Sequence, residues 1–468
     1  MRRGGAAHVV FGGLTTEQHD QVDALSAHPT TVPFDGMRLL SSQVADATGG
    51  QLVGPDVEFD GASFDSRSVE PGQLFVPLVA ERDGHEFIDD ALAAGAAGYL
   101  TAREPAGGTA IRVDDTGEAL MALAAWARRR WDIPVVGVTG SVGKTTTKDF
   151  TRAALSATRR VAANVRSFNN EQGLPVTILG APDGTEALVV EMGMRGFGEI
   201  TRLCDVAAPT IGVVTAVAAS HTERVGGIDG VARAKRELVD ALPSSGTAIL
   251  NGDDERVVAM AVGAAADVLT FGLRGDVCVS GLELDELARP RFRVETPWGA
   301  ARVELAASGF HMASNAAAAI AVVGVIEGRI EPAVEALATA SVSGMRMQVE
   351  HTTSGAIVVN DAYNANPDSM RAALRAIGRM AATRRIAVLG TMGELDEPLA
   401  GHRRVADDAT ALGIEIVAVG TDLYGVDPIG DPHDVGAALG PLGPGDVVLV
   451  KASRAARFER VVDALLDR

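Results

Sequence analysis

The residues with the clearest chemical potential lie in Val135–Thr147, whose sequence is V-V-G-V-T-G-S-V-G-K-T-T-T. An apolar strand leads into a glycine-rich turn that opens a helix, and Lys144 and Thr145 stand at the junction. Backbone N–H groups in such a turn, with the positive end of the helix dipole, form a cradle for polyphosphate. We expect Lys144 to bind the β- and γ-phosphates and the Thr145 hydroxyl to ligate Mg²⁺. The pattern is a variant, because Val138 replaces the first glycine of G-x-x-x-x-G-K-[ST].

Two side chains at the ends of later strands are candidates to join this turn. Glu191 ends the apolar run of V-V-E-M-G, and His221 follows the strand-like segment Ile211–Val217. Ligands of open parallel sheets gather at the carboxyl ends of the strands. We therefore expect Glu191 to reach a phosphate-bound Mg²⁺, whereas a single histidine such as His221 is by itself more often a surface or core residue. Lys235, on the polar helix face of A-R-A-K-R-E-L, would by its pattern alone be a solvated lysine.

Strands and helices must alternate to bring these residues together, and residues 114–340 have that pattern. The helical stretches include Lys144–Leu155 and Asp229–Leu242. The expected strands are Val135–Val138, Ala187–Val190, Ile211–Val214, Ala248–Leu250 and Val268–Phe271. This alternation predicts a mainly parallel sheet covered by helices. Period-two alternation over Cys278–Leu305, interrupted by prolines, predicts a small antiparallel addition.

The length of 468 residues suggests about three domains, and the chain as a whole is predicted to be an α/β protein. Residues 1–36 are predicted to be a poorly ordered N-terminal extension. Residues 37–113 are predicted to form a small α/β domain that begins with a helix from Met37, ended by glycines. Residues 341–468 are predicted to form a Rossmann-like domain that lacks G-x-G-x-x-G. Its expected strands are Ile357–Val359, Arg385–Leu389, Ile414–Val419 and Asp446–Val450, with helices over Asp368–Met380, His402–Leu412 and Ala456–Leu466.

Composition narrows the class of protein. A hydrophobic content of 47% with 22% charged residues indicates a folded globular chain. The net charge of −19 gives a field that repels nucleic acid and anionic lipid. No apolar run is long enough to span a bilayer, and we expect no secretory signal. Cys204 and Cys278 have no metal-like spacing, which fits free thiols in a reducing cytoplasm.

The order of several motifs resembles the Mur ligase family. These motifs are T-G-S-V-G-K-T-T, V-V-E-M-G, S-H-T-E, A-K-R-E-L, N-G-D-D, N-D-A-Y-N-A-N-P-D-S-M, V-L-G-T-M-G-E-L and L-V-K-A-S-R. Within the family the chain is most similar to the ligases that add D-alanyl-D-alanine to UDP-N-acetylmuramoyl-tripeptide. The stretch F-D-S-R-S-V-E-P-G-Q-L-F-V-P-L (residues 64–78) resembles the UDP-binding domain of these enzymes. The resemblance covers nearly all of the chain after Met37.

The resemblance implies a cytoplasmic, monomeric enzyme of peptidoglycan precursor synthesis that couples ATP hydrolysis to formation of an amide bond. The substrate carboxylate would attack the γ-phosphate and give ADP and an acyl phosphate. The amine of D-alanyl-D-alanine would then displace phosphate through a tetrahedral intermediate. Charge that develops on the phosphoryl oxygens requires Lys and Mg²⁺. The partners would be UDP-N-acetylmuramoyl-tripeptide and D-alanyl-D-alanine, with no nucleic acid and no membrane insertion.

The resemblance also implies roles for individual residues. Lys144, His221 and Lys235 would be catalytic, and the lysine that matches Lys235 is often carbamylated in the family. Two Mg²⁺ ions would be held with the help of Thr145, Glu191 and His221. The nucleotide would contact Gly140, Ser141, Gly143, Lys144, Thr145, Thr146, Asn251, His311, Asn315, Arg346 and Asp361. The other substrates would contact Ser66, Arg67, Ser167, Asn169, Asn170, Tyr363, Asn364 and Asn366.

Departures from the family pattern leave alternatives open. Ala452 replaces the usual glycine of K-G-S-R and Thr391 a common aspartate, which leaves room for a different amine substrate. An amino-acid-adding Mur ligase would be expected to show D-N-P-R or D-N-P-A, and a folylpolyglutamate synthase D-G-A-H-N-P. A non-catalytic nucleotide-binding relative is the alternative of another class, and the retained P-loop lysine and its neighbours argue against it. From its pattern alone, Asp368 is expected to cap the helix that follows N-D-A-Y-N-A-N-P.

Overall fold

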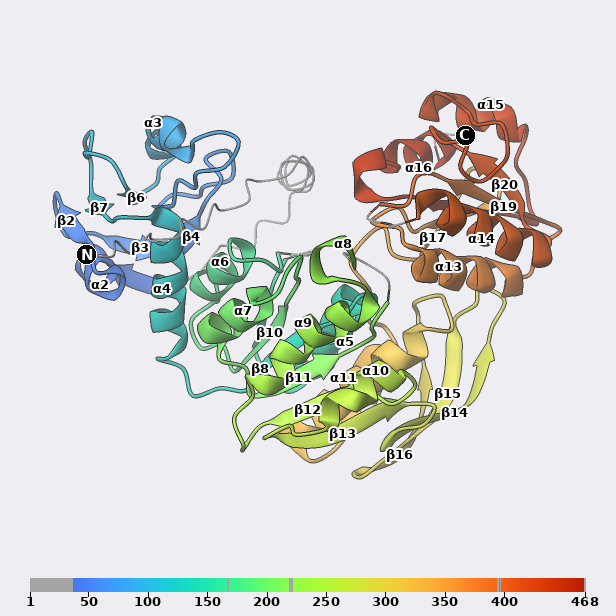
Figure 1. The fold of residues 1–468 in the computed structure, drawn as a ribbon, viewed down its shortest axis with the longest axis horizontal. Helices are drawn as coiled ribbons and strands as arrows, with labels where there is room; N and C mark the ends of the chain where they lie inside the picture. Colours follow the sequence, from blue (N-terminus) through green and yellow to red (C-terminus); the bar gives the residue numbers. More distant parts are fainter. Residues whose placement is uncertain (1–36, 166–167, 219–221, 394, 396, 467–468) are drawn as a thin grey trace, which may run out of the picture. The chain divides into compact units, whose positions relative to one another are not determined.

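The computed structural model describes residues 37–165, 168–218, 222–393, 395 and 397–466. The described chain forms two compact units (Figure 1). Unit 1 holds the described residues up to 130 together with 175–183, and unit 2 holds 131–174 and the described residues from 184 onward. Within these ranges no helix has the length and apolarity to cross a membrane. The predicted disorder of residues 1–36 concerns a segment outside the described residues.

Unit 1 is a small α/β structure. Its described strands form a sheet in the order β2-β7-β6-β5-β4 and a separate pair, β1 with β3. The strands are β1 (Arg38–Leu40), β2 (Gln51–Val53), β3 (Glu58–Asp60), β4 (Ala62–Ser63), β5 (Leu74–Phe75), β6 (Gly98–Thr101) and β7 (Ala110–Arg112). The helices are α2 (Ser41–Thr48), α3 (Ile88–Ala93), α4 (Thr116–Arg128) and most of α6 (Gly173–Leu179), with the short 3₁₀ helix η2 (Gly84–Phe87). The finer domain boundaries at 113 and 340 stay predictions.

The helix predicted from Met37 begins only at Ser41, so this part of the prediction is wrong. Residues 38–40 form β1, in which Leu39 is buried while its two neighbours are exposed, the period-two pattern of a strand. β1 pairs antiparallel with β3, and three residues of pairing outweigh the local helical signal. The predicted glycine stop is confirmed, because Gly49 ends α2 in the left-handed conformation at φ 66°.

Unit 2 contains the predicted parallel sheet. Its described strands lie in the order β16-β15-β14-β13-β12-β11-β8-β10-β9. They are β8 (Val135–Thr139), β9 (Val161–Ala163), β10 (Ala187–Glu191), β11 (Ile211–Val214), β12 (Thr247–Asn251), β13 (Asp267–Gly272), β14 (Val277–Leu284), β15 (Pro290–Thr296) and β16 (Gly299–Glu304). Pairing is parallel from β9 to β14 and antiparallel through β14, β15 and β16. The predicted antiparallel addition is therefore confirmed, as an extension of the main sheet that ends in the edge strand β16.

Helices cover both faces of this sheet (Figure 1). Val136 and Val138 of β8 belong to the same buried cluster as Phe150 of α5 (Lys144–Leu155). Gly137, between them, faces the other way, where an added Cβ would lie 3.0 Å from the Leu238 side chain. On the face of α5 lie α11 (Met312–Glu327) and α12 (Glu331–Leu337), and on the opposite face lie α7 (Glu199–Ala207), α8 (Thr222–Val225), α9 (Ile228–Asp240) and α10 (Glu255–Val258). The central strands are thus buried on both sides, which explains their continuous apolar runs.

The C-terminal part of unit 2 has its own sheet, whose described strands lie in the order β17-β18-β21-β19-β20. They are β17 (Gln348–His351), β18 (Ile357–Asn360), β19 (Arg384–Leu389), β20 (Glu415–Ala418) and β21 (Asp446–Lys451). The helices are α13 (Pro367–Arg379), α14 (Pro398–Ala411), α15 (Val435–Leu439) and α16 (Glu459–Leu466). The predicted elements are confirmed, with α16 starting later than expected because Arg457 takes a left-handed conformation at φ 50°. The antiparallel strand β17 was not predicted.

Candidate active site

The glycine turn between β8 and α5 has a shape that only glycine permits at two positions. Gly140 has φ 152° and Gly143 has φ 82°. A Cβ added at Gly140 would lie 1.9 Å from Thr215 Oγ1, and one at Gly143 would lie 2.7 Å from Asn315 Oδ1. The Thr215 hydroxyl donates to Val142 O at 2.6 Å. This bond fixes the turn against the residue that follows β11. The glycine turn is therefore packed against Thr215 and Asn315 at the N-terminus of α5.

The polar residues of the turn support the same shape. Ser141 Oγ donates to Ala218 O at 3.1 Å and accepts from Ala218 N at 2.9 Å. Lys144 Nζ donates to Gly140 O at 2.8 Å, so its ammonium lies over the turn. Thr146 is buried at 5% exposure. The ammonium and the free end of the α5 dipole therefore face the place where a polyphosphate would bind.

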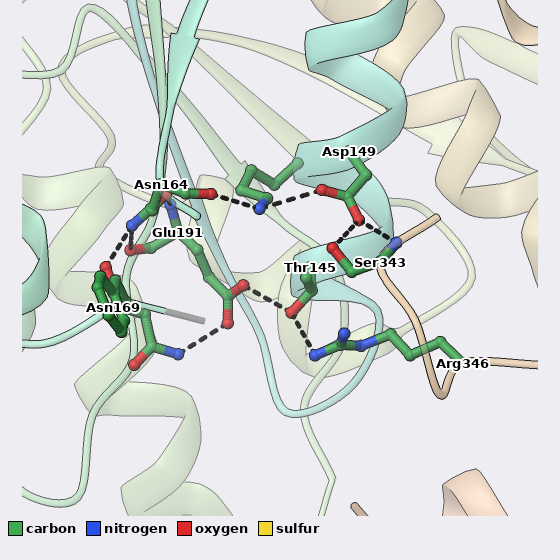
Figure 2. A network of polar contacts seen from close by, with 9 residues as sticks. Thr145, Asp149, Asn164, Asn169, Glu191, Ser343 and Arg346 are labelled. Atoms are coloured by element: carbon green, nitrogen blue, oxygen red, sulfur yellow. Dashed lines mark hydrogen bonds and ion pairs between the residues drawn. The ribbon is translucent and has the colours of Figure 1, made fainter. Parts of the chain in front are cut away.

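Thr145 and Glu191 meet at the carboxyl edge of the sheet (Figure 2). The Thr145 hydroxyl donates to Glu191 Oε2 at 2.6 Å, and Asn169 Nδ2 donates to Glu191 Oε1 at 2.7 Å. Glu191 is 1% exposed. A hydroxyl and a carboxylate side by side are oxygen donors of the kind that suits Mg²⁺. Because no cluster of His, Cys, Asp and Glu with metal-ligand spacing occurs among the described residues, phosphate and water oxygens would have to complete the coordination.

Lys235 is not a solvated lysine, contrary to the reading of its pattern alone. It lies on α9 at 3% exposure, and no described side chain accepts a hydrogen bond from its ammonium. Burial holds the pKa of Lys235 well below its usual value, and the nearby Lys144 charge lowers it further, while Glu191 opposes the shift. This shift favours the neutral amine of Lys235 over its ammonium. The electrostatic influence of Lys144 and Glu191 also places Lys235 close to the P-loop.

Three residues expected at the nucleotide lie around the same edge. Asn251 ends β12, and its Nδ2 donates to Thr215 O at 2.7 Å. Asn315 of α11 accepts from Thr147 Oγ1 at 3.3 Å. His311, the residue before α11, has a buried Nδ1 with no hydrogen-bond partner among the described residues. Burial lowers the pKa of His311, so its ring is neutral and can accept or donate one further hydrogen bond.

The C-terminal part of unit 2 contributes Arg346. Its Nη2 donates to Thr145 Oγ1 at 3.1 Å (Figure 2), and its guanidinium carbon lies 3.8 Å from the centre of the Tyr363 ring. Asp361, at the end of β18, forms an ion pair with the buried Lys451 at 2.6 Å and accepts from Met347 N at 3.1 Å. An arginine stacked on an aromatic ring and aimed at a P-loop hydroxyl is well placed to bind phosphate.

Several residues expected to touch substrate form local hydrogen bonds. Asn366 caps α13 by accepting from Ser369 N at 2.9 Å, so the expectation that Asp368 would be the cap is wrong. Pro367 is the first helical residue, which fixes the cap at the residue before it. Asn364 Oδ1 accepts from Ala365 N at 2.8 Å. Asn170 Oδ1 accepts from Gly173 N at 2.9 Å, at the start of α6 (Gly173–Leu179).

Four expected residues remain: Ser66, Arg67, Ser167 and His221. Ser66 and Arg67 follow β4 in unit 1, where Arg67 Nε donates to Asp65 Oδ1 at 3.0 Å. Ser167 and His221 lie outside the described residues. Their assignment from the resemblance stays a prediction.

Three polar residues near the site were missed by the sequence analysis. Lys148 Nζ donates to Asn164 O at 2.7 Å and pairs with Asp149 at 3.0 Å. Asn164 Oδ1 accepts from Glu191 N at 2.8 Å, and this pairing fixes the end of β10. The sequence offered one signal, the adjacent Lys148 and Asp149 in a helix whose other residues predict burial. Buried charged residues are rare and are normally paired, so this pair indicates a specific interaction.

The fold and the site define a P-loop nucleotide-binding α/β protein with an appended Rossmann-like domain. Two family models match the chain: the Mur ligase middle domain over residues 138–323 and the Mur ligase glutamate ligase domain over residues 345–454. The chain belongs to the Mur ligase family.

Curated relatives extend this match over almost the whole chain. The UDP-N-acetylmuramoyl-tripeptide–D-alanyl-D-alanine ligase of Mycobacterium tuberculosis is 38% identical, covering 92% of this chain and 98% of the relative. The enzyme of that name from Escherichia coli is 32% identical, covering 91% of this chain and 98% of the relative. Among solved structures, MurF from Acinetobacter baumannii matches with a TM-score of 0.85 and 27% identity, covering 93% of this chain and all of that one. MurF from Thermotoga maritima in complex with ADP matches with a TM-score of 0.78 and 28% identity, covering 86% of this chain and 96% of that one.

Proposed function

We propose that this protein is an ATP-dependent, ADP-forming ligase that joins D-alanyl-D-alanine to UDP-N-acetylmuramoyl-tripeptide. The observation that carries the proposal is the meeting of four groups at one sheet edge: the Lys144 ammonium, the Thr145–Glu191 pair, the buried Lys235 and the Arg346 guanidinium. The activity of the relatives that match nine-tenths of the chain, as their names give it, supports the choice of substrates. We expect the enzyme in the cytoplasm, because it consumes ATP.

The reaction needs activation because a carboxylate has no leaving group. The terminal carboxylate of the tripeptide attacks the γ-phosphorus, the bond to the β-phosphate oxygen breaks, and ADP leaves. The amine of D-alanyl-D-alanine then adds to the acyl phosphate carbon, loses a proton and expels phosphate. Lys144 and Arg346 are placed to stabilise the charge that develops on the phosphoryl oxygens in the first step.

Magnesium fits the Thr145–Glu191 pair, and when bound it would neutralise phosphate charge and orient the γ-phosphate. Thr145 and Glu191 would hold it, with a second ion expected from the resemblance through the region of His221. Glu191 is kept in place by the Asn169 amide on its carboxylate and by Asn164 on its backbone N–H.

Carbamylation of Lys235 is part of the proposal. A neutral lysine amine can attack CO₂, whereas an ammonium cannot, and burial lowers the pKa of Lys235 in the required direction. The product is an anion that can ligate metal or position the acyl phosphate. Incubation with ¹³C-bicarbonate should give a carbamate carbon signal in NMR that is absent from a Lys235→Met variant. Identical spectra of the two proteins would refute this part.

The substitutions Thr391 and Ala452 do not require a different amine substrate. Ala452 is fully buried, and a Cβ added at Gly390 would lie 2.7 Å from its methyl group, so that methyl packs in the core. Thr391 uses its backbone carbonyl to accept from Ser453 N at 2.9 Å. Packing accounts for the Ala452 methyl, and D-alanyl-D-alanine remains the proposed amine.

The test is phosphate release from ATP and Mg²⁺ in the presence of UDP-N-acetylmuramoyl-tripeptide, with and without D-alanyl-D-alanine. We expect release that depends on the dipeptide, with one ADP formed for each amide bond. Release that depends on a single amino acid would instead indicate an amino-acid-adding Mur ligase. No release with any amine would indicate a non-catalytic nucleotide-binding relative. The expected monomeric state stays a prediction, which analytical ultracentrifugation checks.

A further inference from the structure

The segment that leads from α12 into β17 is attached to the P-loop helix at two points. Thr145 and Asp149 are one helical turn apart on α5 and so lie on the same face of it. Asp149 Oδ2 accepts from Ser343 N at 2.7 Å and from Ser343 Oγ at 2.6 Å. Thr145 Oγ1 accepts from Arg346 Nη2 at 3.1 Å. Figure 2 shows both attachments, with Ser343 and Arg346 reaching the same stretch of α5.

The Asp149 side chain, like that of Glu191, is buried and hydrogen-bonded. It is 5% exposed, and its other oxygen pairs with Lys148 at 3.0 Å. Lys148 in turn donates to Asn164 O at 2.7 Å, and Asn164 holds the end of β10. One chain of hydrogen bonds therefore joins the Ser343 segment to the strand that presents Glu191. A buried carboxylate that is paired on both oxygens has little freedom to move.

The other side of Arg346 is fixed by the C-terminal sheet. Met345 and Met347, its two neighbours, both take left-handed conformations, at φ 59° and 51°. Non-glycine residues keep such conformations only where their surroundings impose them. Here Met345 O accepts from Tyr363 N at 3.2 Å, and Met347 N donates to Asp361 Oδ1 at 3.1 Å. Arg346 thus stands in a kink that is tied on one side to α5 and on the other to β18.

We propose that Asp149, acting through Ser343, is a positioning residue that sets where Arg346 meets the γ-phosphate. The inference rests on the proposed function only in taking Arg346 as a phosphate ligand. Because its two oxygens bind Ser343 and Lys148, we assign Asp149 no contact with phosphate or with the carboxylate substrate. Its effect is to fix the start of the segment that carries Arg346 against the helix that begins at the P-loop.

The experiment compares the affinities for a nonhydrolysable ATP analogue and for ADP, measured by calorimetry in one magnesium buffer. Loss of the Arg346 position should weaken binding of the triphosphate more than binding of the diphosphate. We expect Arg346→Ala and Asp149→Asn each to lower the ratio of the two affinities about tenfold, and Ser343→Ala to lower it about threefold, because Ser343→Ala leaves the backbone donor in place.

The decisive readout is a double-mutant cycle. Residues that act through one contact are not additive. Asp149→Asn should therefore have no further effect on the affinity ratio in the Arg346→Ala background. A fall in the ratio that persists in that background, or an equal loss of affinity for both nucleotides, would overturn the proposal. An unchanged ratio in Arg346→Ala would overturn it as well.

Glu327→Gln is the matched control. Glu327 accepts from Arg159 Nε at 2.6 Å and from Thr158 Oγ1 at 3.2 Å, at the end of α5 away from the P-loop. This variant should lower the melting temperature without changing the affinity ratio. Should Asp149→Asn fail to fold, the cycle of Ser343→Ala with Arg346→Ala carries the same test. These measurements use nucleotide alone, so failure of dipeptide-dependent phosphate release would refute the proposed function and leave this inference standing.

Discussion

The buried Lys235 makes the stability of the protein depend on pH in a direction that can be worked out. Burial lowers the pKa of Lys235 in the folded state, whereas the unfolded chain keeps the ordinary value of 10.5. Between the lowered pKa and 10.5 the unfolded state holds one more proton than the folded state. Stability therefore rises with pH in this window and falls as the pH is lowered, by about 1.4 kcal/mol per pH unit for one group.

The perturbation is Lys235→Met, which keeps the length of the side chain and removes its charge. As the pH falls below 10.5 we expect the wild type to lose stability relative to this variant, by at most about 1.4 kcal/mol per pH unit while the folded-state amine stays neutral. The variant should also be the more stable protein at neutral pH, because no buried amine opposes folding. The assay is urea unfolding at a series of pH values in CO₂-free buffer, since a carbamate would change the charge of the group. Tryptophan fluorescence reports the transition.

Arg236→Met is the control, because Arg236 is the next residue of α9, is paired with Asp240 at 3.1 Å, and carries a guanidinium that does not titrate in this range. Its stability should follow the wild type across the pH series. Parallel curves for wild type and Lys235→Met would refute the reasoning, since they would mean that Lys235 has the same pKa in both states.

Three further changes test the site and the packing of the C-terminal part of unit 2. Lys144→Ala should lower the rate of product formation at least about 100-fold while the melting curve stays close to wild type; near-normal turnover would exclude its role on phosphate. Asp361→Ala should weaken ATP binding more than binding of the UDP substrate in calorimetry, and should cost about 3–5 kcal/mol of stability because Lys451 is left buried and unpaired. His402→Leu should cost about 1–3 kcal/mol at pH 7, since the His402 ring accepts from Met392 N at 2.9 Å. Burial lowers the pKa of His402, so wild-type stability should fall as the pH drops below 6.5, by more than in the variant.

Local sequence was sufficient for the core of the site. The strand Val135–Thr139 and the helix Lys144–Leu155 follow from an apolar run, a glycine turn and a helical pattern that are contiguous in the chain. The cap of α13 also has a local signal, because a proline at the first helical position points to the residue before it, Asn366. Residue type alone does not distinguish Asn366 from Asp368 as the cap.

The rest depended on contacts between distant segments. Asp149 and Ser343 are 194 residues apart, and the residues next to either one do not predict their hydrogen bond. The short strands Arg38–Leu40 and Gln348–His351 form because a partner strand is available, which a three- or four-residue pattern cannot reveal. Lys235 illustrates the same point for electrostatics: its polar neighbours in sequence suggested solvent, and the packing of α9 against the sheet put it at 3% exposure.

The antiparallel extension of the main sheet also affects how this protein behaves at high concentration. Its outermost strand, β16, offers unpaired backbone donors and acceptors to which a foreign strand could add. Charged side chains line this hairpin, including the pairs Arg293–Glu295 at 2.9 Å and Arg302–Glu304 at 3.2 Å. Exposed pairs of this kind add little to folding stability. Their consequence is colloidal: a docking strand would have to strip water from a row of charges, which discourages edge-to-edge growth into fibres.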